Sequence, residues 1–132
     1  MKAVKARITK GLSQGSRIVC ADNTGAKILG IISVARYKGV KRRKPKAGVG
    51  DVINASVKVG DVKIRHQIVA ALIIRQRAEY RRANGMRVSF EDNAAVLINE
   101  KGEGRGTQIK GPVAKEAVER FSAIGKIASV VV

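Results

Sequence analysis

The sequence predicts a mainly β fold, a small barrel or sandwich of short strands followed by one short helix. Short segments rich in Ile, Val and Leu alternate with turn residues along most of the chain, and the hydrophobic period lengthens only near the C-terminus. No linker divides the 132 residues, a length that suits one domain with an ordinary core. We therefore expect a single domain over residues 1–132, with the strands in about 1–100 and a C-terminal loop and short helix in about 101–132.

The clearest predicted strand covers residues 52–59. Ile53, Ala55, Val57 and Val59 alternate there with polar residues, so we expect these four side chains on one face. Residues 86–90 alternate in the same way. Four further segments are apolar and bounded by Gly, Asn or Asp, and we expect strands there as well: residues 16–21, 27–36, 68–77 and 94–99.

Two turns and one helix connect and complete these strands. Asn84-Gly85 tolerates positive φ and predicts a hairpin between residues 75–82 and the strand at 86–90. Residues 22–25 form another tight connection. Apolar residues then follow at three- and four-residue steps, which predicts one amphipathic helix begun at Pro112 and ended at Gly125: Ala114, Ala117, Val118, Phe121 and Ile124.

The charge of the chain points to a polyanionic partner. The formal net charge is +17, from 27 basic and 10 acidic residues. Residues 1–90 hold 21 basic and 4 acidic side chains, whereas residues 91–132 hold six of each. Self-repulsion of this size opposes compactness unless a polyanion offsets it, so nucleic acid is the leading partner.

The positive charge gathers in two clusters that we expect to bind RNA phosphates. A short basic run alone can be a solvated loop, but two unneutralised, Arg-rich runs favour phosphate, which the guanidinium fork holds by two hydrogen bonds. The first cluster has no acidic residue and contains Arg36, Lys38, Lys41, Arg42, Arg43, Lys44 and Lys46. The second, residues 75–87, contains five Arg against only Glu79, and its expected RNA contacts are Arg75, Arg77, Arg81 and Arg82. Arg75 and Arg77, two residues apart, are expected on the same strand face.

Other classes of function lack the residues they need. His66 and Cys20 are the only histidine and cysteine, too few for a zinc site or a Cys–His pair, and we expect His66 on the surface and Cys20 buried in a strand. Two pairs of carboxylates, Asp51 with Asp61 and Glu91 with Asp92, are expected to cap turns or face solvent rather than bind metal. We therefore predict no enzyme activity, no metal and no cofactor.

A membrane role is also disfavoured. The longest apolar run, residues 68–74, is far shorter than the roughly 20 residues of a membrane helix, and charges interrupt the N-terminus where a signal peptide would be apolar. A surface-bound amphipathic helix would need bulky aromatics, which make up 3% of the chain. The same scarcity argues against base stacking and favours contact with phosphate and ribose on a folded nucleic acid. We expect a cytoplasmic location and no membrane partner.

The order of several motifs resembles a known family. Ala71-Leu72-Ile73-Ile74, Asn84-Gly85, Phe90, Asn93 and Val96-Leu97, at these spacings, are similar to the signature of the universal large-subunit ribosomal protein fourteen (L-fourteen) family. Further blocks resemble that family in the same order: residues 21–26, 47–53 and 106–113. Residues 90–94 and 113–116 resemble the archaeal or eukaryotic members of that family rather than the bacterial ones.

The resemblance implies a five-stranded β-barrel with a projecting hairpin, and a structural role on large-subunit ribosomal RNA at the face that meets the small subunit. It also implies contact with neighbouring ribosomal proteins, small-subunit RNA at an intersubunit bridge, and anti-association factors. The residues expected on that side are Thr107, Gln108, Lys110 and Pro112. The alternative that charge alone allows is a free basic nucleic-acid-binding module of a regulatory or chromatin type.

Overall fold

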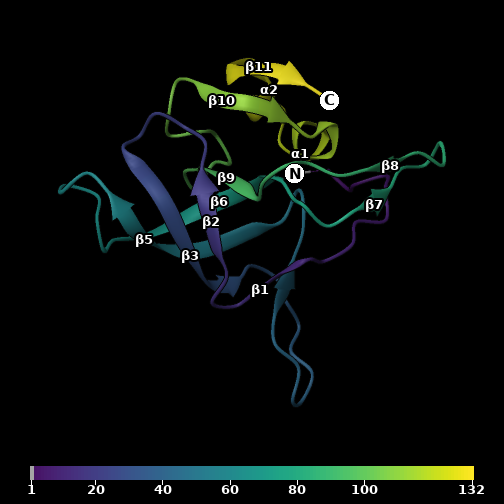
Figure 1. The fold of residues 1–132 in the computed structure, drawn as a ribbon, viewed down its shortest axis with the longest axis horizontal. Coiled ribbons are helices and arrows are strands. Elements are labelled where there is room, and N and C mark those ends of the chain that lie inside the picture. Colours follow the sequence, from purple (N-terminus) through teal and green to yellow (C-terminus); the bar gives the residue numbers. More distant parts are fainter. Residues whose placement is uncertain (1) are drawn as a thin grey trace.

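A computed structural model describes residues 2–132 and is mainly β (Figure 1). The elements follow in the order β1 (Leu12–Ser13), β2 (Arg17–Cys20), β3 (Ala26–Val34), β4 (Lys46–Ala47), β5 (Val52–Gly60), β6 (Ile68–Arg75), β7 (Tyr80–Arg81), β8 (Arg87–Val88), β9 (Ala94–Leu97), β10 (Ile109–Val113), α1 (Lys115–Arg120), α2 (Ser122–Ile127) and β11 (Ala128–Val131). No helix within residues 2–132 is long and apolar enough to cross a membrane.

The centre of the molecule is a closed barrel of five strands in the order β2-β3-β5-β6-β9. Neighbouring strands are antiparallel except where β9 closes the barrel by pairing in parallel with β2, at Val19↔Ala94 and Cys20↔Ala95. Closure leaves no free edge in this sheet that another chain could pair with. The expected five-stranded β-barrel is therefore confirmed.

Alternation along the strands fills the barrel with apolar side chains. Ile53, Ala55 and Val57 of β5 are fully buried, as the sequence pattern predicts, but Val59 is 40% exposed. The pairing with β3 explains the difference, because Val57 pairs with Leu29 whereas Val59 pairs with Ile28, so two residues of β5 oppose one step of β3. Such a bulge shifts the alternation by one residue and turns Val59 outward.

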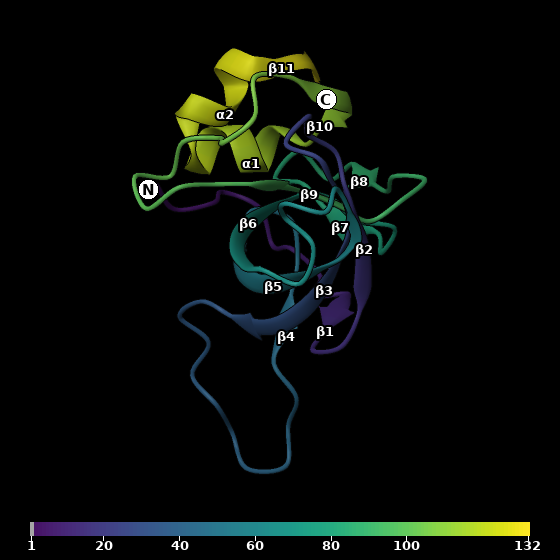
Figure 2. The same cartoon turned by 90° about the vertical axis from the view of Figure 1, so that its left-hand side faces the viewer.

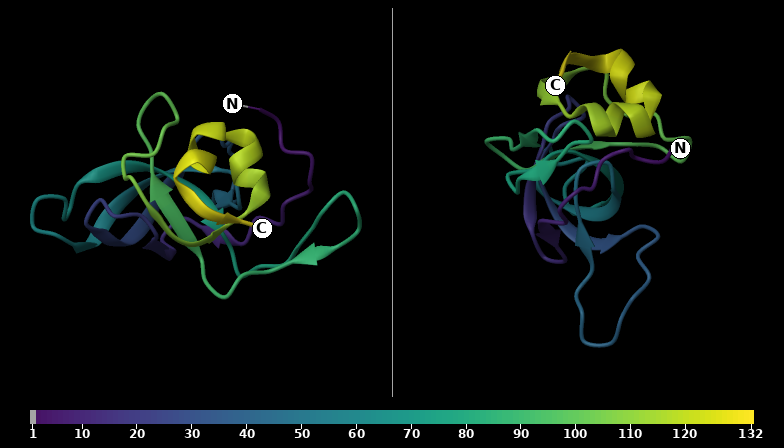
Figure 3. Two further views of the ribbon diagram at one scale, coloured as in Figure 1. Left: turned by 90° about the horizontal axis from the view of Figure 1, so that it is seen from above. Right: turned by 90° about the vertical axis from the view of Figure 1, so that its right-hand side faces the viewer.

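The C-terminal segment folds back over one end of the barrel, where the two helices and the parallel pair β10–β11 lie together (Figures 1 and 3). The prediction of one helix from Pro112 to Gly125 is wrong in its details. Pro112 lies in β10, and the helical backbone breaks at Phe121 (φ −127°, ψ 88°), which separates α1 from α2. Gly125 does not end a helix but lies within α2, where an added Cβ would meet Val118 Cγ1 at 2.8 Å, so the glycine lets α2 pack closely on α1.

Three segments project from the barrel. The longest is the loop between β3 and β4, which hangs below the barrel in Figures 1 and 2. The hairpins β5–β6 and β7–β8 project on opposite sides in Figure 1. His66, in the β5–β6 turn, is exposed as expected. The projections place cationic side chains well away from the apolar interior.

Candidate nucleic-acid interface

The first cluster of basic residues forms the projecting loop of Figure 2, which we call the basic loop (residues 36–46). Its ends are fixed to the body, because Ala35 N–H donates to Val52 O at 2.9 Å and β4 pairs with β1. All seven predicted side chains are exposed, and within residues 2–132 none of them forms an ion pair: Arg36, Lys38, Lys41, Arg42, Arg43, Lys44 and Lys46. The loop therefore concentrates positive charge with no internal neutralisation.

Hydrogen bonds define the backbone at the tip of the basic loop. The Arg43 N–H donates to Val40 O at 3.0 Å, and the Tyr37 hydroxyl donates to Lys44 O at 3.3 Å across the loop. Arg42 has a φ of 65°, a left-handed conformation that is uncommon for residues with a side chain and costs about 1–2 kcal/mol. The tip thus keeps a strained turn made of cationic residues, a feature found more often at functional positions than elsewhere.

The second predicted cluster leads into the hairpin β7–β8. The hairpin forms where Asn84-Gly85 predicts it, with Gly85 N–H donating to Arg82 O at 2.9 Å. Of the two turn residues, Gly85 has positive φ (89°) and Asn84 does not. The Asn84 side chain accepts a hydrogen bond from Met86 N–H at 3.0 Å. The connection is therefore a type I turn followed by a left-handed glycine. Arg77 and Arg81 are exposed around this hairpin.

Arg75 lies in a different environment from Arg77. Its guanidinium is buried and bidentate to Asp92, with Nε–Oδ1 at 2.8 Å and Nη2–Oδ2 at 3.2 Å, and its Nη1 donates to the carbonyls of Lys110 and Pro112. The expectation that Arg75 and Arg77 share a strand face is wrong, because β6 ends at Arg75 after a register shift against β9. Arg75 therefore supports the chain internally, and the RNA contact predicted for it stays a prediction.

The guanidinium of Arg82 also forms hydrogen bonds within the protein. Its Nε donates to Glu116 Oε1 at 2.8 Å, and its Nη2 donates to Val132 O at 2.6 Å. The buried Glu116 also accepts a hydrogen bond from the Tyr80 hydroxyl at 2.7 Å. Burial, together with this hydrogen bond, raises the pKa of Tyr80 above its ordinary value. The network fixes the hairpin β7–β8 to helix α1 and the C-terminus.

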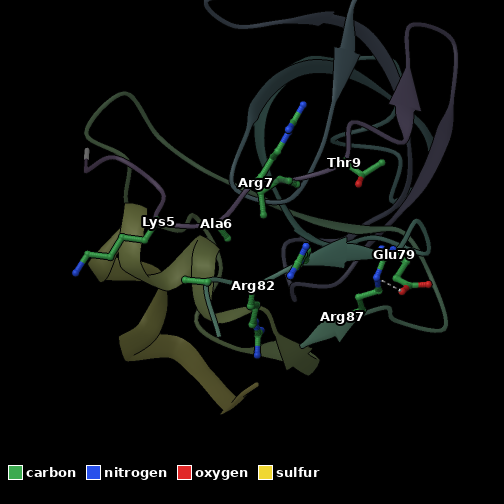
Figure 4. A pocket seen from close by; sticks show the side chains of 10 residues that line it. Lys5, Ala6, Arg7, Thr9, Glu79, Arg82 and Arg87 are labelled. Atoms are coloured by element: carbon green, nitrogen blue, oxygen red, sulfur yellow. Dashed lines mark ion pairs between the residues drawn. The ribbon is translucent and has the colours of Figure 1, made fainter. Parts of the chain in front are cut away.

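A basic cleft of about 620 Å³ lies between the N-terminal arm (residues 2–11) and the hairpin β7–β8 (Figure 4). Its cationic lining consists of Lys5, Arg7, Arg81, Arg82 and Arg87, and its one acidic lining residue is Glu79. In Figure 4, Glu79 and Arg87 lie side by side at one end, and Lys5 lies at the other. The cleft has no counterpart in the sequence pattern, since the arm contributes scattered single cations rather than a run.

The C-terminal loop that precedes the helices is held by a backbone hydrogen bond from Lys110 N–H to Ala21 O at 2.6 Å and by two side-chain anchors. The Asn23 carbonyl oxygen accepts from Thr107 N–H at 2.9 Å, and the Asn23 amide donates to Thr107 Oγ1 at 2.7 Å. The second anchor is Arg75, at Lys110 and Pro112. The side chains of Gln108 and Lys110 are exposed. The Thr107 hydroxyl is hydrogen-bonded to Asn23, and Pro112 is half-buried. Of the four residues expected at a protein contact, Gln108 and Lys110 are therefore the most available.

A buried carboxylate beside the only cysteine organises the β2–β3 turn. Asp22 accepts hydrogen bonds from Leu97 N–H at 2.8 Å and from the Thr24 hydroxyl at 2.6 Å, and the Cys20 thiol donates to it at 3.1 Å. Burial, and then the charge of Asp22, raise the pKa of Cys20 to about 12. Cys20 is buried in β2, as predicted.

The carboxylate of Asp51 also serves the fold. Asp51 caps a turn by accepting from Gly48 N–H at 2.8 Å, as expected, and it additionally pairs with Lys10 and Arg120. Across the described residues, no three His, Cys, Asp or Glu side chains are grouped so that they could hold a metal ion.

The basic loop and the hairpin β7–β8 both carry exposed cations on segments that project from the barrel. This arrangement suits the binding of a polyanion by phosphate contacts.

The chain is similar over nearly its whole length to a family of ribosomal proteins. Residues 11–132 match the family model described as ribosomal protein L14p/L23e. Among similar curated proteins, the large ribosomal subunit protein uL14 of Halorubrum lacusprofundi is 55% identical, that of Halobacterium salinarum strain R1 53%, and that of Methanocorpusculum labreanum 49%. Each alignment spans 132 residues and covers all of both chains. These sources are archaeal, which agrees with the type expected from residues 90–94 and 113–116. From the family match and these full-length relatives, the chain belongs to the L14p/L23e family of ribosomal proteins.

Proposed function

We propose that this chain is a non-catalytic, RNA-binding constituent of the large ribosomal subunit, which holds large-subunit ribosomal RNA through phosphate contacts of the basic loop. The relatives are named as large ribosomal subunit proteins, which supports a structural ribosomal role in the cytoplasm. The observation that carries the RNA proposal is the basic loop itself, with seven exposed cations and no ion-pair partner within residues 2–132. Such a loop is stabilised when phosphates lie between its cations.

The shape of the basic loop favours RNA over a compact acidic protein. The loop extends away from the barrel (Figure 2) and carries three Arg and four Lys along residues 36–46. A projecting cationic loop can enter a groove or a junction of a folded RNA, where phosphates face it from more than one side. Arginines there can each hold a phosphate by two hydrogen bonds, which fixes position as well as charge.

We further propose that the C-terminal loop contributes to the intersubunit face. This proposal is supported by the exposed side chains of Gln108 and Lys110 on a backbone held by Asn23 and Arg75. The region beyond residue 90 has balanced charge, so it gains little from a polyanion and suits protein partners better. The partners proposed for it are neighbouring ribosomal proteins and anti-association factors. Lys110, the one cation of residues 106–113, is the proposed contact with small-subunit RNA at a bridge.

Sedimentation distinguishes this proposal from a free DNA-binding module. The tagged chain is expressed in its native host, and the lysate is separated on a sucrose gradient containing high salt, which weakens non-specific phosphate binding. We expect the chain to travel with large subunits and to stay there as salt is raised. Recovery with chromosomal DNA, or at the top of the gradient, would favour the regulatory or chromatin alternative.

A further inference from the structure

Three arginines lie opposite one another across three neighbouring segments of the chain. Arg7 of the N-terminal arm forms an antiparallel bridge with Arg81 of β7, and Arg81 is in turn paired with Arg87 of β8. We call these three residues the arginine row. All three are exposed, and they line the basic cleft of Figure 4.

The arginine row is unfavourable in the isolated protein. Like charges directly opposite each other in a sheet destabilise the pairing, and here the same charge occurs at three successive positions. The one carboxylate in the lining is Glu79, whose Oε1 lies 3.5 Å from Nε of Arg87, and both side chains are more than half exposed. An exposed pair of this kind contributes little, so most of the charge remains uncompensated.

The two walls of the cleft are nevertheless held firmly. The arm is fixed by the buried Gln76, whose amide donates to Thr9 O at 2.9 Å, and by Lys2 N–H, which donates to Arg120 O at 3.2 Å. The hairpin is fixed through Arg82 to Glu116. These contacts hold the backbones that carry the cations next to each other in the absence of any ligand, and a prearranged site loses less entropy on binding.

From this geometry we propose that the arginine row is a second RNA-binding site, at which the basic cleft holds consecutive phosphates of one RNA strand. The inference rests on the proposed function, to which it adds the N-terminal arm and Arg87 as contact residues. Neighbouring strands are about 4.8 Å apart, so guanidinium groups on three strands can follow a sugar–phosphate backbone that crosses them. Lys5, exposed at the other end of the cleft, extends the same charged surface.

The test is a salt titration of binding to deproteinised large-subunit ribosomal RNA. The variant Arg7→Gln/Arg81→Gln/Arg87→Gln removes the row and keeps polar side chains. Its matched control is Arg105→Gln/Lys115→Gln/Lys126→Gln, the same reduction of charge at exposed positions of the neutral C-terminal region. We expect the slope of log K against log salt to fall by about 2 in the row variant, at roughly 0.7 for each phosphate that is no longer bound, and much less in the control.

Thermal melting of the free proteins shows whether the row has a structural role instead. Removing opposed like charges should leave the melting temperature of the row variant unchanged or raise it. If the triple variant does not fold, Arg7→Gln alone is measured, with an expected slope change of about 0.7. A slope equal to that of the control, or a clear fall in melting temperature with no change in slope, would overturn the inference.

The variant Lys41→Ser/Arg42→Ser/Arg43→Ser/Lys44→Ser separates this inference from the proposed function. If the slope falls in the basic-loop variant and not in the row variant, the arginine row fails while the proposed function stands. If neither variant changes the slope, both fail. If the slope falls in each variant independently, the two effects should add, because the sites are on different projections and share no partner.

Discussion

The guanidinium of Arg75 lies directly against Gly111, where an added Cβ would come within 2.7 Å of Nη1. Gly111 has a φ of 79°, and the carbonyls on either side of it, those of Lys110 and Pro112, both accept hydrogen bonds from the same nitrogen. Arg75 is itself fixed by Asp92. One buried arginine at the end of a barrel strand thus sets the shape of the C-terminal loop.

Replacing Arg75 should therefore reduce stability rather than RNA binding alone. Arg75→Ala removes the pairing with Asp92 and leaves two carbonyls without a donor, which should lower the free energy of unfolding by about 2–4 kcal/mol. The matched control is Arg77→Ala, since Arg77 is exposed and its change should stay within about 0.5 kcal/mol. Denaturant titration measures both, and equal decreases would contradict the assigned role of Arg75.

The buried Cys20 thiol should make the free energy of unfolding decrease with rising pH in the alkaline range. The folded protein holds its pKa at about 12 against an ordinary value of 9.0, because burial and Asp22 disfavour the thiolate. Its contribution to the free energy of unfolding is complete below pH 9 and declines as the pH rises from 9 towards 12, because the unfolded chain ionises first.

The variant Cys20→Ala isolates this contribution, since all other titrating groups remain. We expect the free energy of unfolding of the parent to fall more steeply between about pH 8.5 and 10.5 than that of Cys20→Ala. Denaturant unfolding monitored by circular dichroism at fixed ionic strength gives both curves. Parallel curves would show that burial of the thiol is not coupled to folding.

The intersubunit proposal is tested at the two exposed side chains of the C-terminal loop. Thr107 is unsuitable because its hydroxyl accepts from Asn23, so its replacement would disturb the loop itself. Gln108→Glu/Lys110→Glu should leave the protein folded and bound to large subunits, yet weaken subunit joining, because it places negative charge where contact is proposed. Light scattering of reconstituted subunits measures joining.

A matched control makes the same pair of changes elsewhere, as Gln14→Glu/Lys63→Glu, at exposed positions on the barrel side of the molecule. Joining should be normal with this control. If the Gln108/Lys110 variant joins as well as the control does and binds anti-association factors normally, the loop is not part of the intersubunit contact.

The periodicity of the sequence predicts a small barrel or sandwich of short strands, and the family resemblance adds the five-stranded barrel, but neither predicts its irregularities. Alternation predicted the inward side chains of Ile53, Ala55 and Val57, whereas the bulge that exposes Val59 depends on pairing with β3. Likewise, Gly125 resembles a helix stop by its position, but its role depends on the close approach of Val118. Local patterns do not specify such tertiary contacts.

The sequence predicts the part of the candidate site whose cations are adjacent along the chain. It does not predict the part whose cations come together only when the chain folds. The basic loop is visible as a run of cations. Arg75 and Arg77 look alike in sequence, and only the pairing of Arg75 with Asp92 and its burial separate them. The cleft brings Arg7 next to Arg81 by a long-range bridge, for which no sequence spacing provides a signal.

The most direct test of the central claim is the salt dependence of RNA binding by the basic loop. Parent and Lys41→Ser/Arg42→Ser/Arg43→Ser/Lys44→Ser are titrated with deproteinised large-subunit ribosomal RNA between low and moderate salt. The control is Lys27→Ser/Arg105→Ser/Lys115→Ser/Lys126→Ser, with an equal reduction of charge at exposed positions outside the loop. We predict that the slope of log K against log salt falls by roughly 0.7 for each phosphate that the variant no longer binds, up to about 3 in all, and far less in the control. An unchanged slope in the loop variant would contradict RNA binding by the basic loop.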